Sequence, residues 1–269
     1  MPDFAYIRAR TIAEAVEALS ADPQARALSG GQTLIPSIKQ RLAQPSALVD
    51  LGAIAALRGI AREEAHLRVG AGMRHAEVAA DAGVRALAPG LAALAGLIGD
   101  PQVRNLGTLG GSIATNDPAA DYPAACLALD AEIETSARRL PAEAFFTGFF
   151  ETALAPGEIV TAVRFTCPRA GAYAKHRSPA SGYALTGVFV ALLEAGPRVA
   201  VTGAGPGVFR WAEAERRLAE GFTADALEGL VPPADDFLSD LHASAAYRAQ
   251  LVAVMARRAL AGAIAGSRG

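Results

Sequence analysis

Two turns in which adjacent glycines stand beside hydroxyl residues lie far apart in the sequence. The first is the segment 27–36, Ala-Leu-Ser-Gly-Gly-Gln-Thr-Leu-Ile-Pro, and the second is the segment 104–112, Arg-Asn-Leu-Gly-Thr-Leu-Gly-Gly-Ser. Glycine permits positive φ and lets a ligand approach the backbone closely. Successive N–H groups in such a turn form a concave site for an anion. The two turns together predict a site that holds the two phosphates of one dinucleotide from opposite sides.

The charges around these turns indicate how a phosphate would be held. No Lys or Arg lies between Ala27 and Ile38, or between Leu106 and Glu134. A phosphate would therefore be bound by backbone dipoles and hydroxyl groups and not by cations. The chain lacks the Gly-Lys-Ser/Thr of a Walker loop and the Gly-x-Gly-x-x-Gly of a Rossmann fold. The alternative interpretation is that each turn is only a tight loop, because glycine marks turns everywhere.

Three residues outside the turns have types suited to a cofactor site. Asp121 could accept hydrogen bonds from ribose hydroxyl groups, or it could cap a helix over 122–129. Tyr183 could stack on or cover an aromatic ring, or it could be a half-buried tyrosine of a strand. Lys175 could face a cofactor, or it could be a solvated charge on a strand. No Ser-His-Asp, Cys-His or paired-carboxylate arrangement is identifiable, so cofactor binding is favoured over a self-contained hydrolytic site.

Cysteine and histidine usage limits the redox chemistry that the chain can perform alone. The two cysteines, Cys126 and Cys167, cannot by themselves ligate an iron–sulfur cluster or a structural zinc. We expect free thiols rather than a disulfide. The four histidines show no metal-ligand spacing, so no metal site is predicted. Redox chemistry would come from a bound organic cofactor or from another chain.

Length and composition bound the class of protein. The 269 residues suffice for one large domain or two modest ones, and 52% of them are hydrophobic. Only 19% are charged, with a net charge of −2, which argues against a nucleic-acid partner. No apolar stretch reaches the roughly 20 residues of a membrane helix. The N-terminus carries no secretory signal pattern, so we expect a soluble cytoplasmic protein without a membrane span.

The hydrophobic pattern predicts alternating helices and strands. Thr11 and Glu14 form a capping-box pattern ahead of the first helix, which Asp22-Pro23 ends. An apolar stripe of Val252, Met255, Ala256 and Ala259 predicts core packing of the last helix. Strands are expected over 25–29, 47–51, 67–71, 158–166, 183–193 and 198–202. Helices are expected from 12, from near 36, over 74–86, 90–98, 122–129 and 211–220, and from 243 to the end.

The chain resembles a known family, the FAD-binding medium subunits of molybdenum hydroxylases. It is most similar to the carbon monoxide dehydrogenase medium subunits, and it is also similar to the FAD domain of xanthine dehydrogenase. The resemblance covers nearly the whole chain. The segments that carry it are 29–36 (Ser-Gly-Gly-Gln-Thr-Leu-Ile-Pro), 48–51, 100–105 (Asp-Pro-Gln-Val-Arg-Asn), 107–112 (Gly-Thr-Leu-Gly-Gly-Ser), 116–121 (Asn-Asp-Pro-Ala-Ala-Asp) and 153–160.

This resemblance implies a fold and a set of cofactor contacts. The implied fold is α+β: a two-subdomain FAD-binding fold of the vanillyl-alcohol-oxidase (PCMH) type, followed by a small C-terminal α/β domain. The FAD-binding domain would span 1–168, with subdomains of about 1–55 and 56–168, and the C-terminal domain 169–269. The implied contacts to FAD are Ala27, Leu28, Ser29, Gly30, Gly31, Gln32, Thr33, Leu34, Thr108, Leu109, Gly110, Gly111, Ser112, Asp121, Val160, Lys175 and Tyr183.

The resemblance also implies a function. The chain would be the flavoprotein subunit of an oxidoreductase, bound to a molybdenum-cofactor large subunit and a [2Fe-2S] small subunit. FAD would collect electrons from the iron–sulfur clusters and pass them to an external acceptor. No residue of this chain is expected to act as a catalytic acid or base. Two alternatives stay open: a standalone FAD-dependent oxidase, and a scaffold subunit that keeps the fold but binds no cofactor.

Overall fold

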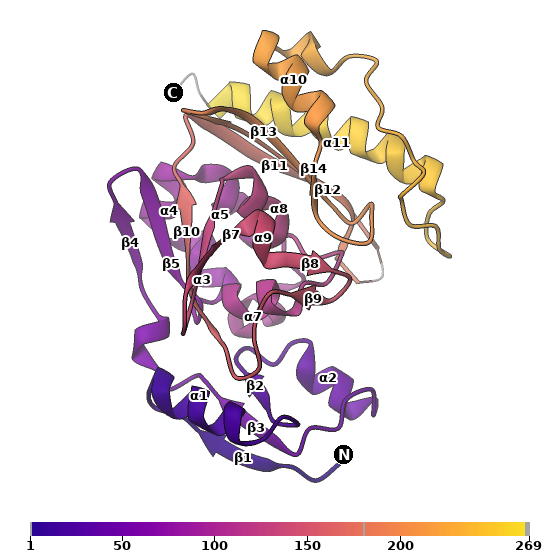
Figure 1. The fold of residues 1–269 in the computed structure, drawn as a ribbon. Helices are drawn as coiled ribbons and strands as arrows, with labels where there is room; N and C mark the ends of the chain where they lie inside the picture. Colours follow the sequence, from indigo (N-terminus) through magenta and orange to yellow (C-terminus); the bar gives the residue numbers. More distant parts are fainter. Residues whose placement is uncertain (1, 180, 267–269) are drawn as a thin grey trace.

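The computed structural model describes residues 2–179 and 181–266. Three parts are stacked on one another: a small N-terminal lobe, a middle part and a C-terminal part (Figure 1). Their sheets have three, five and four strands, which come from residues 5–50, 60–166 and 170–210. The domain boundaries expected near 55 and at 168 lie between these stretches, and they stay a proposal.

The N-terminal lobe is a small parallel sheet with helices on its two sides. The strand order is β1-β3-β2, with both pairings parallel. The predicted cap of the first helix is confirmed, because the Glu14 N–H donates to Thr11 Oγ1 at 3.1 Å. Ala15 and Val49 pack in one small core beneath that helix. The elements are β1 (Ala5–Arg8), α1 (Ile12–Ala21), β2 (Arg26–Leu28), α2 (Leu34–Lys39) and β3 (Ala47–Asp50).

The middle part is an antiparallel sheet packed against a group of short helices. Its strand order is β4-β5-β10-β6-β7. The strands are β4 (Ile60–Glu63), β5 (His66–Gly70), β6 (Glu132–Thr135), β7 (Arg139–Pro141) and β10 (Val160–Thr166), and the adjoining hairpin is β8 (Phe146–Gly148) and β9 (Glu151–Thr152). The helices are α3 (His75–Ala80), α4 (Ala82–Leu87), α5 (Pro89–Gly96), α6 (Pro101–Leu106), α7 (Leu109–Thr115), α8 (Tyr122–Ala128) and α9 (Ala142–Phe145).

One predicted helix of the middle part is divided in two. The segment 74–86 forms α3 and α4, which meet at Asp81. The backbone of Asp81 is extended, and its carboxylate accepts a hydrogen bond from the Val84 N–H at 2.9 Å. Asp therefore acts as the N-cap of a new helix, a role that competes with continuation of the first. The prediction of one continuous helix there is wrong.

The C-terminal part is a four-stranded sheet covered by a long helix. The sheet comprises β11 (Ala170–Arg177), β12 (Ala184–Leu193), β13 (Gly196–Thr202) and β14 (Phe209–Arg210), and the helices are α10 (Ala212–Glu220) and α11 (Ala245–Gly266). The predicted stripe on α11 is confirmed as core, with Val252, Met255, Ala256 and Ala259 each at most 1% exposed. By length and composition α11 could cross a membrane, which the sequence pattern did not predict. Half of its apolar window is buried inside the fold.

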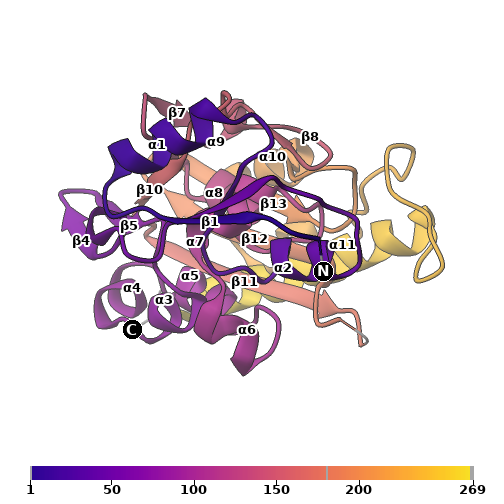
Figure 2. The ribbon, with the colours of Figure 1, turned by 90° about the horizontal axis from the view of Figure 1, so that it is seen from below.

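The parts share interfaces that place the site. Tyr173 of β11 and Phe189 of β12 belong to the same buried cluster as Leu91 of α5 and Tyr122 of α8, so the C-terminal sheet completes the core of the middle part. Seen from below, the N-terminal lobe lies across the middle part with α7 behind it (Figure 2). The two glycine turns therefore face one another across the boundary between lobe and middle part.

Candidate FAD-binding site

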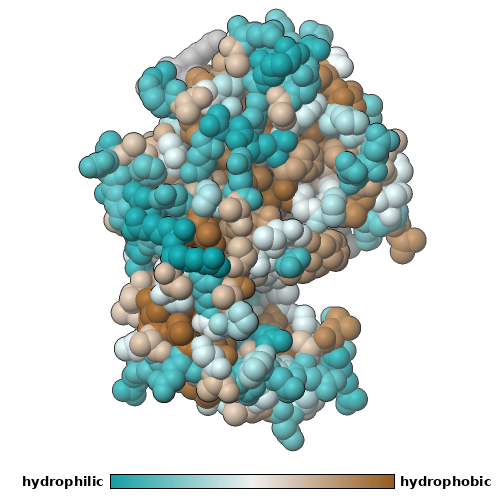
Figure 3. Space-filling view, viewed as in Figure 1, coloured by the Kyte–Doolittle hydropathy of each residue, from teal (hydrophilic) through white to brown (hydrophobic). Residues whose placement is uncertain are grey.

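A cavity of about 650 Å³ opens between the N-terminal lobe and the rest of the chain. The space-filling view shows the hollow beside the lobe (Figure 3). Its size falls in the range of cofactor sites, about 300–1,000 Å³. Tyr183 brings the C-terminal part into the lining. The predicted contact residues that line the cavity are Ala27, Leu28, Ser29, Gly30, Gly31, Gln32, Thr33, Leu34, Thr108, Gly110, Gly111, Ser112, Asp121, Val160 and Tyr183.

Two predicted contacts do not line the cavity. Leu109 is fully buried in the core of the middle part, where its apolar side chain is removed from water. Lys175 points from β11 to a buried carboxylate, and its side chain is only 1% exposed. The alternative that Lys175 is a solvated strand charge is therefore wrong, and the structure brings it to Asp121 instead of to the cavity.

The first glycine turn presents a row of unbonded amides to the cavity. It begins where β2 ends, after the Leu28 carbonyl has accepted a hydrogen bond from the Leu51 N–H at 2.8 Å. Gly31 has φ +70°, a conformation that side-chain-bearing residues rarely adopt. Within the described chain, the N–H groups of residues 29–33 donate to no protein acceptor. Buried or half-buried amides normally have partners, so this row is suited to an anionic ligand.

The second turn differs, because its amides are already used within the protein. The Gly110 N–H donates to the Ala71 carbonyl at 2.8 Å, and the Leu109 N–H donates to the Met73 carbonyl at 3.0 Å. The Gly111 N–H donates to Thr108 Oγ1 at 3.2 Å, which caps α7. The expectation of free amides therefore holds for the first turn and is wrong for the second turn. The second turn contributes hydroxyl groups and the positive end of a helix dipole.

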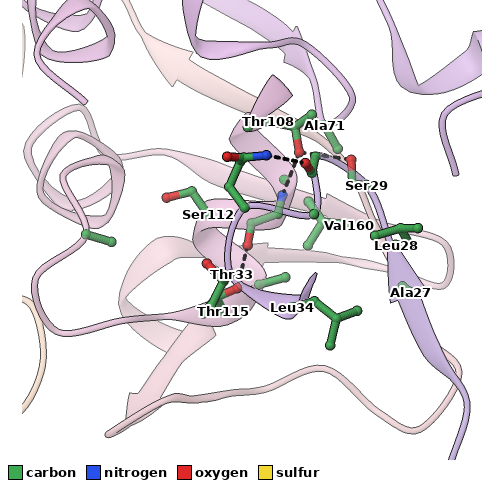
Figure 4. A pocket seen from close by; sticks show the side chains of 18 of the residues that line it. Ala27, Leu28, Ser29, Thr33, Leu34, Ala71, Thr108, Ser112, Thr115 and Val160 are labelled. Carbon is green, nitrogen blue, oxygen red and sulfur yellow. Dashed lines mark hydrogen bonds between the residues drawn. The ribbon is translucent and has the colours of Figure 1, made fainter. Parts of the chain in front are cut away.

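The two turns are packed directly against each other. Ser29 Oγ and Thr108 Oγ1 are hydrogen-bonded at 2.9 Å, and the hydroxyl side chains of Ser29, Thr33, Thr108, Ser112 and Thr115 gather around the turns (Figure 4). A Cβ on Gly30 would lie 2.3 Å from the Leu106 carbonyl oxygen. Backbone contact alone therefore requires glycine at position 30.

The same holds for Gly110, where a Cβ would lie 2.5 Å from the Ala71 Cβ. Replacement of Gly110 by valine would disturb the fold with or without a cofactor. The presence of Gly30 and Gly110 consequently does not separate a cofactor-binding subunit from an empty scaffold. Gly31 and the unbonded amides beside it are the features that favour a bound anion.

Asp121 lies in a buried polar cluster at the start of α8. Lys175 Nζ donates to both carboxylate oxygens at 2.9 Å, and the Tyr173 hydroxyl donates to Oδ1 at 2.5 Å. Burial raises the pKa of Asp121, although Lys175 and Tyr173 oppose that shift. Asp121 makes no side-chain cap to α8, so the alternative of a simple helix cap is wrong. Tyr173 is a residue of this cluster that sequence reasoning missed, because packing of the C-terminal sheet against α8 brings it beside Asp121.

Tyr183 and Val160 complete the predicted set. Tyr183 precedes β12 and is 42% exposed, and burial beside Asp117 raises the pKa of its hydroxyl. Val160 opens β10 and is buried. The rest of the wall is largely apolar, and it includes Leu51, Leu57, Ile98, Leu154 and Ile159. An apolar wall beside a polar turn matches a dinucleotide that carries a large aromatic ring.

His75 also lines the cavity and is a second residue that sequence reasoning missed. The sequence presented it only as a histidine without metal-ligand spacing. Its burial beneath the second turn depends on an isolated β-bridge between Arg74 and Thr108, which no local pattern indicates.

These features define a class of protein: an α+β fold with a cavity between its parts and a row of free amides suited to an anionic ligand. The family described as "FAD binding domain in molybdopterin dehydrogenase" matches residues 2–168. The carbon monoxide dehydrogenase medium chain of Hydrogenophaga pseudoflava is 34% identical, with 96% of each chain covered. The nicotine 6-hydroxylase medium subunit of Paenarthrobacter nicotinovorans is 33% identical, with 97% of each chain covered.

Solved structures are similar over the same length. A carbon monoxide dehydrogenase structure from Hydrogenophaga pseudoflava superposes with a TM-score of 0.89 at 34% identity, covering 98% of both chains. A Cu,Mo-CO dehydrogenase structure gives a TM-score of 0.90 at 32% identity, covering 98% of this chain and 99% of that one. The chain belongs to the family of FAD-binding domains of molybdopterin dehydrogenases. Its fold is the predicted α+β FAD-binding fold, its cofactor is FAD, and it is an oxidoreductase flavoprotein subunit.

Proposed function

We propose that this chain is the FAD-binding subunit of a molybdenum hydroxylase complex, together with a molybdenum-cofactor large subunit and a [2Fe-2S] small subunit. Family membership over 2–168 and the full-length likeness to medium chains support this proposal. The single observation that carries this proposal is the cavity between the N-terminal lobe and the other two parts, with its row of unbonded amides. The free thiols of Cys126 and Cys167 are consistent with a cytoplasmic location.

Different residues of the cavity would contact different parts of FAD. The amides of residues 29–33 would hold the diphosphate, and Thr33 and Ser112 would add hydroxyl groups. Asp121 would face the ribose side with its geometry fixed by Tyr173 and Lys175. Val160 and Tyr183 would border the flavin ring. FAD supplies the redox chemistry when bound, passing electrons from the iron–sulfur clusters to an external acceptor; the protein binds, orients and shields it.

Purification of the complex tests the proposal. We expect the chain to co-purify with two partner subunits and to bind one FAD, measured by visible flavin absorbance after reconstitution. A chain that binds FAD but never co-purifies with partners would instead be a standalone oxidase. A chain that co-purifies but takes up no flavin would be a scaffold. Either outcome contradicts the proposed function.

A matched pair of glycine variants tests the first turn. Gly31 (φ +70°) lines the cavity, whereas Gly229 (φ +68°) lies outside it, with open space where a Cβ would stand. Alanine at either position incurs a similar backbone strain of roughly 1–2 kcal/mol, and at position 31 its Cβ would also lie 3.1 Å from Ile35 Cγ1, which adds a steric push on the turn. We expect Gly31→Ala to weaken FAD binding about tenfold, equal to about 1.4 kcal/mol, and Gly229→Ala to leave it unchanged. Equal FAD affinities in a fluorescence titration would contradict the assignment of the turn.

A further inference from the structure

His75 is a buried polar residue whose ring has no protein partner. It is 4% exposed, and its Nδ1 is enclosed without a hydrogen bond. Its ring makes no hydrogen bond to the described chain; only its backbone N–H does, to the Gly107 carbonyl at 3.0 Å. An enclosed polar group without a partner is costly. Nε2 is not among the enclosed atoms and has no partner in the described chain either, so a ligand in the cavity would reach this ring through Nε2.

The position of His75 identifies which part of a ligand it meets. Its Nε2 lies against Gly107, 2.6 Å from the place where a Cβ of that residue would stand. The Gly107 Cα in turn lies 2.6 Å from the ideal Cβ position of Gly30. His75 therefore sits directly beneath the point where the two glycine turns meet.

Tyr122, which lies beside His75, carries a hydroxyl group that could donate a hydrogen bond to an imidazole nitrogen. The Tyr122 hydroxyl is also enclosed and without a partner, and the two ring centroids are 5.4 Å apart. A hydroxyl can donate to an imidazole nitrogen that carries no proton, and the other nitrogen then carries the proton. The structure has no hydrogen bond between the two groups; a hydrogen bond from this hydroxyl to Nδ1 would leave the proton on Nε2. Tyr122 itself does not line the cavity.

We propose that His75 is a neutral hydrogen-bond donor to the diphosphate of FAD, through Nε2–H, and that Tyr122 is the positioning residue that selects this tautomer. The inference rests on the proposed function. Burial, with a smaller effect from Arg104, lowers the pKa of His75 to about 4, so the ring is neutral at physiological pH. A neutral donor agrees with a site in which residues 27–38 and 106–134 contain no Lys or Arg.

Variants at position 75 separate this role from a structural one. His75→Leu removes the donor and also the costly enclosed nitrogen. We expect FAD affinity to fall about 10- to 100-fold, the effect of one hydrogen bond to a charged group, while the FAD-free protein melts at the same or a higher temperature. His75→Gln, which keeps a donor, should recover part of the affinity. ADP, which carries the same diphosphate, should lose affinity by a similar factor.

The outcomes that overturn the inference are distinct from failure of the proposed function. If wild-type protein binds no FAD, the proposed function fails. If wild type binds FAD and His75→Leu binds FAD or ADP equally well, or if its FAD-free form melts at a lower temperature, the role of His75 is wrong.

Nitrogen NMR of histidine-labelled protein gives a readout that does not depend on affinity. The His75 signal, assigned by its loss in His75→Gln, should report the Nε2–H tautomer in the FAD-free wild type. In Tyr122→Phe the population of the other tautomer should rise. A wild-type signal of the Nδ1–H tautomer or of the imidazolium form at neutral pH would overturn the proposal, as would an unchanged tautomer in Tyr122→Phe.

Discussion

At the scale of single residues, glycine serves two different purposes in this chain. Gly30 and Gly110 allow backbone segments to touch, because a Cβ at either position would lie within 2.5 Å of another residue. Gly31 instead supplies positive φ, and the amides beside it stay free. A sequence motif with two adjacent glycines does not distinguish these purposes. In the first pair only Gly31 has the positive φ that shapes the row of free amides.

The buried ring of His75 predicts that the protein loses stability in acid. Its pKa is lowered from 6.5 to about 4 in the folded protein, so the folded state binds fewer protons than the unfolded state between these values. Its contribution to stability is fully present above pH 6.5 and is lost as the pH falls to about 4. The loss is on the order of 3 kcal/mol, at about 1.4 kcal/mol per pKa unit.

Urea unfolding from neutral pH down to about pH 4 measures this effect. The free energy of unfolding of wild type should fall more steeply than that of His75→Leu, which lacks the titrating ring. Parallel curves for the two proteins would show that His75 titrates in the folded state as it does in the unfolded chain.

At the scale of elements, the ion pair of Asp121 and Lys175 joins α8 to β11. Both side chains are at most 3% exposed, so the pair that joins two parts of the chain is almost fully buried. Removal of one partner from a buried pair leaves an uncompensated charge and costs about 3–5 kcal/mol. The cluster therefore fixes the start of α8, and with it the cavity wall that carries Asp121.

Lys175→Met should destabilise the protein by about 3–5 kcal/mol at neutral pH. Without its cation, Asp121 keeps a pKa raised by burial. Stability of the variant is therefore greatest below the unfolded pKa of about 4 and is lost as the pH rises through the folded pKa. Chemical unfolding of Lys175→Met and of the double variant Asp121→Asn/Lys175→Met at acidic and alkaline pH measures this. A variant whose stability rises with pH would contradict the assignment.

At the scale of the whole molecule, the cavity depends on all three parts. The first turn comes from the N-terminal lobe, α7 from the middle part, and Tyr183 from the C-terminal part. The core of the middle part also includes Tyr173 and Phe189 of the C-terminal sheet. A ligand in this cavity contacts every part at once, so its binding energy should stabilise the folded chain as one unit.

Calorimetry with and without FAD tests this coupling. At FAD concentrations about 100 times Kd, the free energy of unfolding should rise by about 2.7 kcal/mol, and the whole melting transition should move together. A shift limited to one of two separate transitions would mean that the cavity is formed by a single part. FMN, which lacks the diphosphate bridge and adenosine of FAD, is the control ligand and should give a smaller shift.

The sequence by itself determined what depends on neighbouring residues. The N-cap of α1 and the apolar stripe of α11 are local patterns, and both have the predicted structure. The division of 74–86 at Asp81 was missed because a cap and a continuing helix compete locally by small free energies. The family likeness likewise followed from short motifs and their order.

Tertiary structure alone decided which polar groups are free and which are paired. The amides of the second turn bond to Met73 and Ala71, Asp121 bonds to Tyr173 and Lys175, and His75 bonds to nothing through its ring. These partners lie on distant segments, and packing of the sheets brings them together. Because a hydrogen bond requires contact in space, no spacing along the chain could have revealed which donors are left for the cofactor.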